Sequence, residues 1–322
     1  MSGAGPQQAR AGGASGAGAG TAAAAGQGTD GSRPFERTMF SYDPIDEFTA
    51  TVADWIWFHA QGQPNIEIEA KIGTILDRST GQRLFMPVMT ETILLENTDG
   101  IRFVSQVTTP HHSAMNKLLN QLVTYTNAKN YSGTKVNYQR QMETDYFHKV
   151  DSSILPPGLL ESIPRPKGFE GNTEREDKLR FTRDRDGKPK HNHALIKRRL
   201  ASLEVFCPKR AYDYRISINT ETPVPMPAQD SKPTYWREKN RMTYKHELVQ
   251  VDLTLVNSTN PMSGSELSHE LEIELQDANK LLAAGQEARG DGVSQDWTPY
   301  DDMCHIFLNN IRMLLRNIPE GM

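Results

Sequence analysis

Strict alternation of glutamate and aliphatic residues is the clearest pattern in the chain. Between residues 268 and 275, Glu270, Glu272 and Glu274 take every second position, and leucine or isoleucine fills the gaps. A period of two is that of a β-strand, so one face carries the carboxylates and the other the aliphatic side chains. Same-face neighbours lie about 6.6–6.8 Å apart, so ionised carboxylates would repel by roughly 2–3 kcal/mol per pair at an effective dielectric of about 20. Such a row requires either open water or nearby cations.

A second stretch of the same kind lies towards the N-terminal end. In residues 66–72, Glu67, Glu69 and Lys71 alternate with isoleucine and alanine. A single acidic row is typical of the solvated face of an amphipathic strand, because glutamate is rarely buried without a partner. Two acidic rows with basic strands between them favour a shared site instead.

The segments between the acidic rows also alternate, and many of their polar positions are basic. Residues 178–184 place Arg180 in a polar row, Asp186 followed by Gly187 predicts a hairpin turn, and the return strand carries Lys197. Three more strands are predicted at 212–221, 236–245 and 249–255. Their polar rows are Asp213, Arg215, Ser217, Asn219 and Glu221 on the first, Arg237, Lys239, Arg241, Thr243 and Lys245 on the second, and Gln250, Asp252 and Thr254 on the third.

Helical spacing of apolar residues predicts amphipathic helices at 44–60, 113–129 and 300–316, with further helical segments flanking a loop at 284–298. The remaining segments are predicted as short strands or irregular edges at 82–109, a long strand at 134–150 and a loop at 152–177. Residues 1–32 are mostly Gly, Ala, Ser and Gln, and such a segment cannot bury enough surface to offset its ordering entropy. We therefore expect a disordered tail over 1–32 and a single domain over 33–318.

The broad apolar faces of the helices must be buried, and the aliphatic faces of the strands are their natural partners. The charged rows then lie on the opposite face of the sheet. If the sheet closes, that face becomes a hydrophilic tunnel with helices packed outside; if it stays open, the fold is α+β with one solvated charged face. Closure would bring the first and last strands, which both carry glutamates, side by side, and this segregation of charge favours the predominantly antiparallel tunnel.

Composition narrows the functional classes. The chain has 322 residues with a formal net charge of −4, which argues against a protein that coats nucleic acid non-specifically. Cys207 and Cys304 are the only cysteines, which leaves no disulfide framework or thiolate metal cluster and fits a reducing intracellular compartment. No apolar run is long enough to span a membrane, and the N-terminus has no signal-peptide pattern.

The polar rows predict a metal site next to a phosphate site. Neighbouring carboxylate rows suit a hard divalent cation such as Mg²⁺ or Mn²⁺, and Arg and Lys rows suit phosphoryl oxygens. Together they point to phosphoanhydride hydrolysis, and the chain has no P-loop or kinase motif. A calcium loop at 184–187 is disfavoured because the downstream glutamate is missing, and His191 and His193 fit a solvent-exposed hairpin end better than a metal pair.

These segments, taken together, resemble the fungal-type mRNA-capping RNA 5′-triphosphatases, which belong to the triphosphate tunnel metalloenzymes. The resemblance covers roughly residues 35–316 and rests on the order of the two acidic strands and the basic strands between them. The segments that carry it are IEIEAKIG at 66–73, KLRFTRD at 178–184, YDYRISIN at 212–219, KNR at 239–241, DLT at 252–254 and HELEIE at 269–274.

The resemblance implies an eight-stranded antiparallel tunnel that removes the γ-phosphate from the 5′-triphosphate end of nascent RNA, the first step of cap formation. It implies metal ligands at Glu67, Glu69 and Glu274, and metal-bound waters held by Asp252 and Glu272. It further implies a γ-phosphate grip by Arg180, Lys239 and Arg241, with Lys197 as another lumen cation, Glu221 orienting the attacking water and Glu270 paired with a lumen cation. Gln250 departs from the pattern, because at least one family member has an arginine there.

The resemblance also implies a homodimer, a nuclear location, activity on nucleoside triphosphates in vitro, and the RNA guanylyltransferase or the RNA polymerase II machinery as partners. Two other functions fit the residues. One is a tunnel hydrolase for inorganic tripolyphosphate or another small triphosphate. The other is a non-catalytic module that binds polyphosphate or RNA ends.

Overall fold

The computed structural model describes residue 39 and residues 46–96, 98–151, 153, 155–167, 177–190, 194–228, 230–289 and 297–319. The chain divides into two units, Met1–Pro44 and Ile45–Met322, and the helices and strands of the described residues lie in the second. The predicted tail over 1–32, His191 and His193 lie outside the described residues. A single domain over 33–318 stays a prediction.

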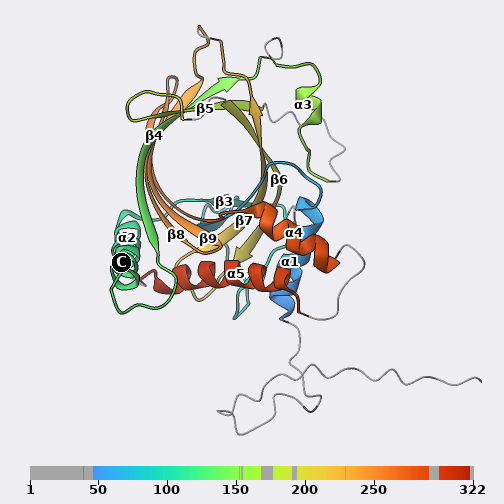
Figure 1. Ribbon diagram of the computed structural model, residues 1–322, viewed down its shortest axis with the longest axis vertical. Coiled ribbons are helices and arrows are strands. Elements are labelled where there is room, and N and C mark those ends of the chain that lie inside the picture. The colour runs from blue at the N-terminus through green and yellow to red at the C-terminus, as the bar shows by residue number, and fades with distance from the viewer. Residues whose placement is uncertain are drawn as a thin grey trace, which may run out of the picture. The chain divides into compact units, whose positions relative to one another are not determined.

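Within the described residues, eight antiparallel strands close into a barrel (Figure 1). Their order around the barrel is β10-β9-β8-β4-β5-β6-β7-β1, and β1 pairs with β10 to close it. The closing register sets Glu69 opposite Glu274 and Lys71 opposite Glu272, so the two acidic rows are neighbours as predicted and the open-sheet alternative is wrong. The strands are β1 (Ile66–Asp77), β4 (Asn137–Lys149), β5 (Lys178–Asp184), β6 (Ala194–Phe206), β7 (Asp213–Val224), β8 (Tyr235–His246), β9 (Val249–Asn260) and β10 (Gly264–Leu275).

Two short strands extend the barrel. β2 (Thr92–Ile93) pairs with β6, and β3 (Ile101–Val104) pairs with β1. Both fall in the region predicted as short strands or irregular edges. Where β5 ends, the Asp184 carboxylate accepts hydrogen bonds from the backbone N–H groups of Asp186 and Lys188. Gly187 in this turn has a φ of 77°. Asp184 therefore stabilises the predicted tight turn.

The helices are α1 (Glu47–Ala60), α2 (Thr109–Thr126), the short α3 (Leu159–Ser162), α4 (Ala278–Arg289) and α5 (Pro299–Asn317). The helix predicted at 113–129 begins and ends earlier in the structure. The Thr108 side chain caps its N-terminus, and Pro110 suits a first turn that needs no N–H donor. The loop predicted to begin at 284 was also wrong, since α4 continues to Arg289.

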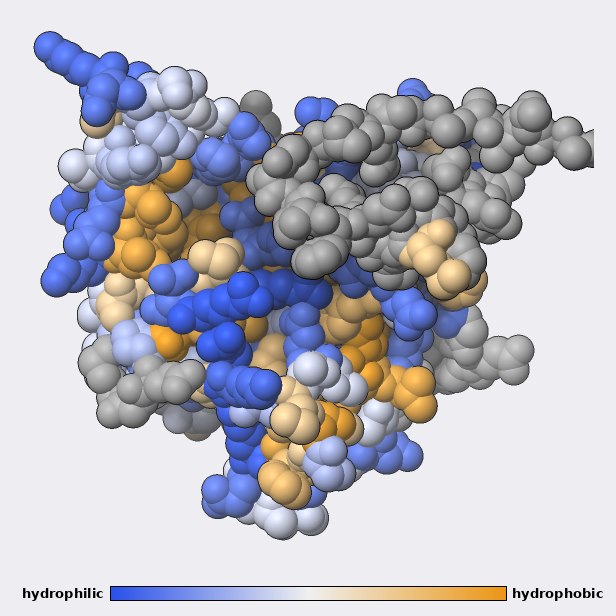
Figure 2. All heavy atoms as spheres, turned by 90° about the horizontal axis from the view of Figure 1, so that it is seen from below, coloured by the Kyte–Doolittle hydropathy of each residue, from blue (hydrophilic) through white to orange (hydrophobic). Residues whose placement is uncertain are grey.

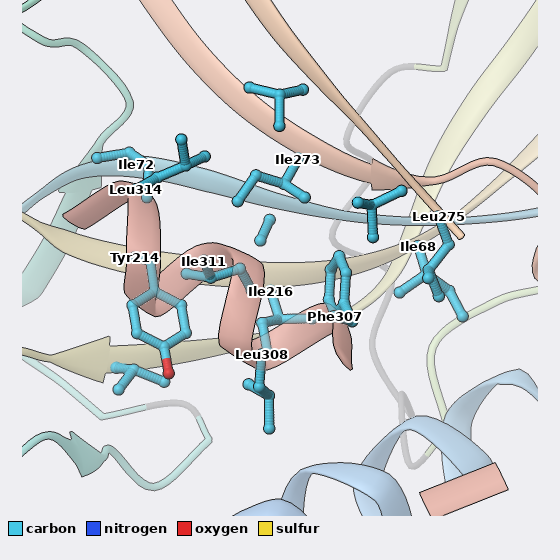
Figure 3. Close-up of a cluster of buried hydrophobic side chains, with 14 of the residues drawn as sticks. Ile68, Ile72, Tyr214, Ile216, Ile273, Leu275, Phe307, Leu308, Ile311 and Leu314 are labelled. Atoms are coloured by element: carbon cyan, nitrogen blue, oxygen red, sulfur yellow. The ribbon is translucent and has the colours of Figure 1, made fainter. Parts of the chain in front are cut away.

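The aliphatic faces of the strands pack against α5 outside the barrel (Figure 3). Ile72, Tyr214 and Ile273 of the barrel face Ile311 and Leu314 of the helix, and all five side chains are buried. Each such side chain contributes about 1.5–3 kcal/mol of burial free energy. This packing fixes the register of the strands, because a slip by one residue would turn the charged rows into the apolar core.

The surface over α5 combines hydrophilic side chains with smaller hydrophobic patches (Figure 2). Ile306 and Met313 of α5 are 38% and 52% exposed. Among the described residues, no helix is long and apolar enough to cross a membrane.

Candidate functional site

Acidic and basic side chains from different strands meet in the lumen of the barrel. Lys197 on β6 contacts Glu67 and Glu69 on β1, although β7 lies between the two strands in the sheet. Such contacts are possible only if these side chains point inward across the curved sheet. The sequence-based prediction that the charged rows line a tunnel is therefore confirmed.

The proposed metal ligands lie together where β1 meets β10. Glu69 and Glu274 are opposite each other in the register. The Asn219 amide on β7 donates to Glu67 Oε2 at 2.9 Å and to Glu69 Oε1 at 3.0 Å, which orients both carboxylates. Within the described ranges, no group of three or more His, Cys, Asp or Glu side chains is arranged so that it could hold a metal ion without moving. In this structure the ammonium of Lys197 neutralises much of the carboxylate charge.

Glu274 shows that this carboxylate cluster can accept a further positive charge. Its carboxylate receives a 3.0 Å hydrogen bond from the neutral amide of Gln250. Burial, and then the neighbouring Glu67 carboxylate, raise the pKa of Glu274 to about 8. A carboxyl group whose ionisation is opposed by neighbouring carboxylates is stabilised in its charged form by a nearby cation, and carboxylate oxygens suit a hard divalent ion. Glu67, Glu69 and Glu274 therefore fit the metal that the resemblance implies.

Two arginines present unpaired donors to the lumen. Arg180 donates from Nη2 to Glu221 Oε1 at 2.9 Å, and Arg241 donates from Nη1 to Asp252 Oδ2 at 3.3 Å. The Nε–H groups of both arginines are buried and have no hydrogen-bond partner among the described residues. A buried donor without a partner costs about 1–3 kcal/mol, so both groups would gain from a phosphoryl oxygen.

Lys239 is held more tightly than its predicted role in phosphate binding suggests. Its ammonium lies 2.7 Å from Glu143 Oε1 and 2.8 Å from Asp145 Oδ2, and only 8% of the residue is exposed. Both carboxylates belong to β4, and neither was predicted from the sequence as a site residue. A role for Lys239 in binding phosphate stays a prediction.

The other predicted residues pair across the lumen. Glu221 lies between Arg180 and Lys197, whose Nζ is 3.6 Å from Glu221 Oε1. Glu270 accepts a 2.6 Å hydrogen bond from Arg237, which is the predicted pairing with a lumen cation. The remaining carboxylates have different partners: Glu272 binds Lys71, and Asp252 accepts hydrogen bonds from Thr243 and Gln250.

The pairing of Glu143 with lysines predicts an acid-sensitive contribution to stability. Although burial opposes ionisation, Lys239 and Lys190 lower the pKa of Glu143 to about 2. A lowered folded-state pKa stabilises the fold above the unfolded pKa of about 4.3, and this stabilisation is lost as the pH falls towards 2. The carboxylate should therefore contribute on the order of 3 kcal/mol at pH 7. Urea unfolding should show Glu143→Gln less stable than the parent at pH 7, with the gap narrowing below pH 4. A gap that does not change with pH would show that the charge of Glu143 is not what stabilises the fold.

Comparison with known proteins gives a consistent result. Residues 42–320 match the family model described as mRNA capping enzyme, beta chain. A Cryptococcus neoformans protein named mRNA-capping enzyme subunit beta is 33% identical over 89% of this chain and 66% of its own length. A Schizosaccharomyces pombe protein of the same name is 29% identical over 84% of this chain and 82% of its own length.

Solved structures show the same similarity. The S. pombe Pct1 RNA triphosphatase superposes with a TM-score of 0.72 at 27% identity, covering 88% of this chain and 98% of the Pct1 chain. A second structure, of Pct1 in complex with the Spt5 CTD, also matches with a TM-score of 0.72, at 28% identity. The closed eight-stranded barrel is thus the tunnel fold of Pct1.

Proposed function

Because this chain belongs to the mRNA capping enzyme beta chain family, we propose that it removes the γ-phosphate from the 5′-triphosphate end of nascent mRNA. The observation that carries the proposal is the convergence of Arg180 and Arg241 with Glu67, Glu69 and Glu274 in one lumen. The unpaired guanidinium donors suit a phosphate tail, and the carboxylates suit its counterion.

Each group of lumen residues has a different role in phosphoanhydride hydrolysis. Arg180 and Arg241 hold the γ-phosphoryl oxygens and stabilise the negative charge that spreads over them in the transition state. Glu221 orients the attacking water, whose oxygen forms the new bond to phosphorus as the bridging oxygen leaves with the diphosphate. Glu67, Glu69 and Glu274 would hold the divalent cation, with Asp252 and Glu272 around it, and that cation would supply Lewis-acid polarisation of the phosphoryl group.

Glu221 is suited to accept a hydrogen bond from water. Burial opposes its ionisation, but Arg180 and then Lys197 lower its pKa below the ordinary value. The carboxylate is therefore ionised at neutral pH and is held between two cations. Its accepting oxygens are in place before the substrate arrives, which reduces the cost of ordering the water.

The cation is Mg²⁺ or Mn²⁺ in this proposal, because both prefer oxygen ligands. We further propose that the protein acts as a homodimer in the nucleus and meets the RNA guanylyltransferase or the RNA polymerase II machinery. The names of the relatives as capping-enzyme subunits, and the complex of Pct1 with the Spt5 CTD, support such partners.

Competition between substrates tests the RNA assignment. With Mg²⁺ or Mn²⁺, we expect the protein to release phosphate from triphosphate-ended RNA. Tripolyphosphate at a matched concentration should inhibit this release only partly. Release from tripolyphosphate with none from RNA would instead identify a tripolyphosphatase. A binding module would release no phosphate with wild-type protein, so release that vanishes in Glu67→Ala excludes that alternative.

A further inference from the structure

An aromatic pair lies at one end of the barrel, at the edge of the lumen. Phe147 on β4 and Tyr235 on β8 are opposite each other in the register, with ring centroids 4.3 Å apart and an interplanar angle of 5°. The Lys178 ammonium lies 4.7 Å from the centre of the Tyr235 ring. Beside them is a cavity of about 150 Å³, lined by His148, Lys149, Lys178, Thr234, Tyr235 and Asn260.

The strand register places this pair on the same face of the sheet as the phosphate-binding residues. Phe147 is directly opposite Arg180 on β5 and two residues beyond Asp145, which contacts Lys239 inside the lumen. Tyr235 is two residues before Arg237, whose side chain reaches Glu270. Since side chains alternate along a strand, both rings face the tunnel rather than the outer core.

The spacing along β8 fits a nucleotide that extends from the phosphate site. Tyr235 precedes Arg241 by six residues, which is about 20 Å along the strand and roughly 15 Å along the axis of a tilted barrel. A 5′-triphosphate separates its γ-phosphorus from its base by a length of this order. Arg237 lies on the way, and Lys178 lies beyond the aromatic pair, opposite Lys149. Towards the other end, Gln141 is opposite Arg241, and Gln250 is opposite Lys245.

We propose that Phe147, Tyr235 and Lys178 form a platform for the first nucleoside of the RNA. The base stacks on the aromatic pair, and Lys178 moves from the Tyr235 ring to the phosphate that follows this nucleoside. This inference rests on the proposed function and adds the direction in which the RNA leaves the tunnel. Stacking on aromatic rings is available to every base, so the platform accepts any first nucleotide.

The test compares triphosphate-ended RNA, which has a first nucleoside, with tripolyphosphate, which has none. We expect Tyr235→Leu to lower kcat/KM for triphosphate-ended RNA by about tenfold, since leucine removes the aromatic ring on which the base stacks. Tripolyphosphate has no base, so its kcat/KM should not change. Tyr235→Phe should keep most of the activity on RNA. Tyr138→Leu is the matched control, because it removes a tyrosine that packs against Tyr244. It should leave the ratio of kcat/KM between the two substrates unchanged.

Equal losses on both substrates, or no loss on RNA, would overturn the platform. A wild-type protein that cleaves only tripolyphosphate would instead overturn the RNA assignment, so the two failures are distinguishable. If Tyr235→Leu does not fold, binding of 2-aminopurine riboside 5′-triphosphate to Glu221→Gln with Mg²⁺ provides a second measurement. Stacking should quench the fluorescence of the base, and bound nucleotide without quenching would contradict the inference.

Discussion

Replacing Glu67 by glutamine should reduce phosphate release from triphosphate-ended RNA by on the order of 10³-fold, while the barrel stays folded. The amide removes the negative charge from a proposed metal ligand and keeps its shape. A metal that polarises the transferred group supplies several kcal/mol in the transition state, and each 1.36 kcal/mol is a factor of ten in rate. Steady-state assays with saturating Mn²⁺ measure the loss, and circular dichroism checks the fold.

The matched control for this substitution is Glu238→Gln on β8. Glu238 is exposed and accepts a hydrogen bond from Asn257. It follows Arg237, which points into the lumen, so it lies on the opposite face of the strand. This control should keep nearly full activity. Wild-type turnover in Glu67→Gln would contradict a metal-binding role for Glu67.

Arg180→Lys should lose about 10²-fold in kcat even though the positive charge is kept. The planar guanidinium can hold Glu221 and still offer the buried Nε–H to a phosphoryl oxygen, whereas an ammonium is a single point charge without that fork. The net loss of one hydrogen bond to a charged group, which contributes about 1.5–3 kcal/mol or roughly 10- to 160-fold in rate, sets the size of the effect. Single-turnover kinetics on triphosphate-ended RNA separate this loss from weaker binding.

Arg183→Lys provides the control on the same strand. Arg183 is exposed and lies over the rings of Tyr146 and Phe181. Its substitution should leave kcat within about twofold of the parent, as expected for a surface change. If Arg180→Lys keeps as much kcat as Arg183→Lys, the proposed phosphate contact by the Arg180 guanidinium is wrong.

The alternation of charged and aliphatic residues was enough to predict the tunnel. Both rows of glutamates, at Glu67 and Glu69 and at Glu272 and Glu274, lie on strands whose other face packs against a helix. Aliphatic residues therefore fill every second position of these strands, and the period of two clearly indicates a β-strand. Closure of the sheet could be predicted, because only a closed barrel places the glutamates of the first and last strands side by side. The Lys and Arg residues of the strands between them then face the same lumen.

Glu143 and Asp145 were missed because β4 lacks that contrast. Their row does have the strand period, since Gln139 and Gln141 precede them, but Tyr138, Arg140 and Met142 fill the other face and are exposed. No helix imposes aliphatic residues at these positions. The partners of individual cations were also beyond a sequence pattern. Alternation places the adjacent Lys197 and Arg198 on opposite faces of β6, but it does not show that Lys197 binds Glu67 or that Arg198 binds Asp177.

The most direct test of the site is the position of Mn²⁺ in a crystal grown with the metal and a non-hydrolysable triphosphate. We expect an anomalous-scattering peak inside the barrel within coordination distance of Glu67, Glu69 and Glu274, with phosphoryl oxygens on Arg180 and Arg241. Manganese bound only outside the barrel, or a triphosphate that does not enter the lumen, would contradict the proposed site.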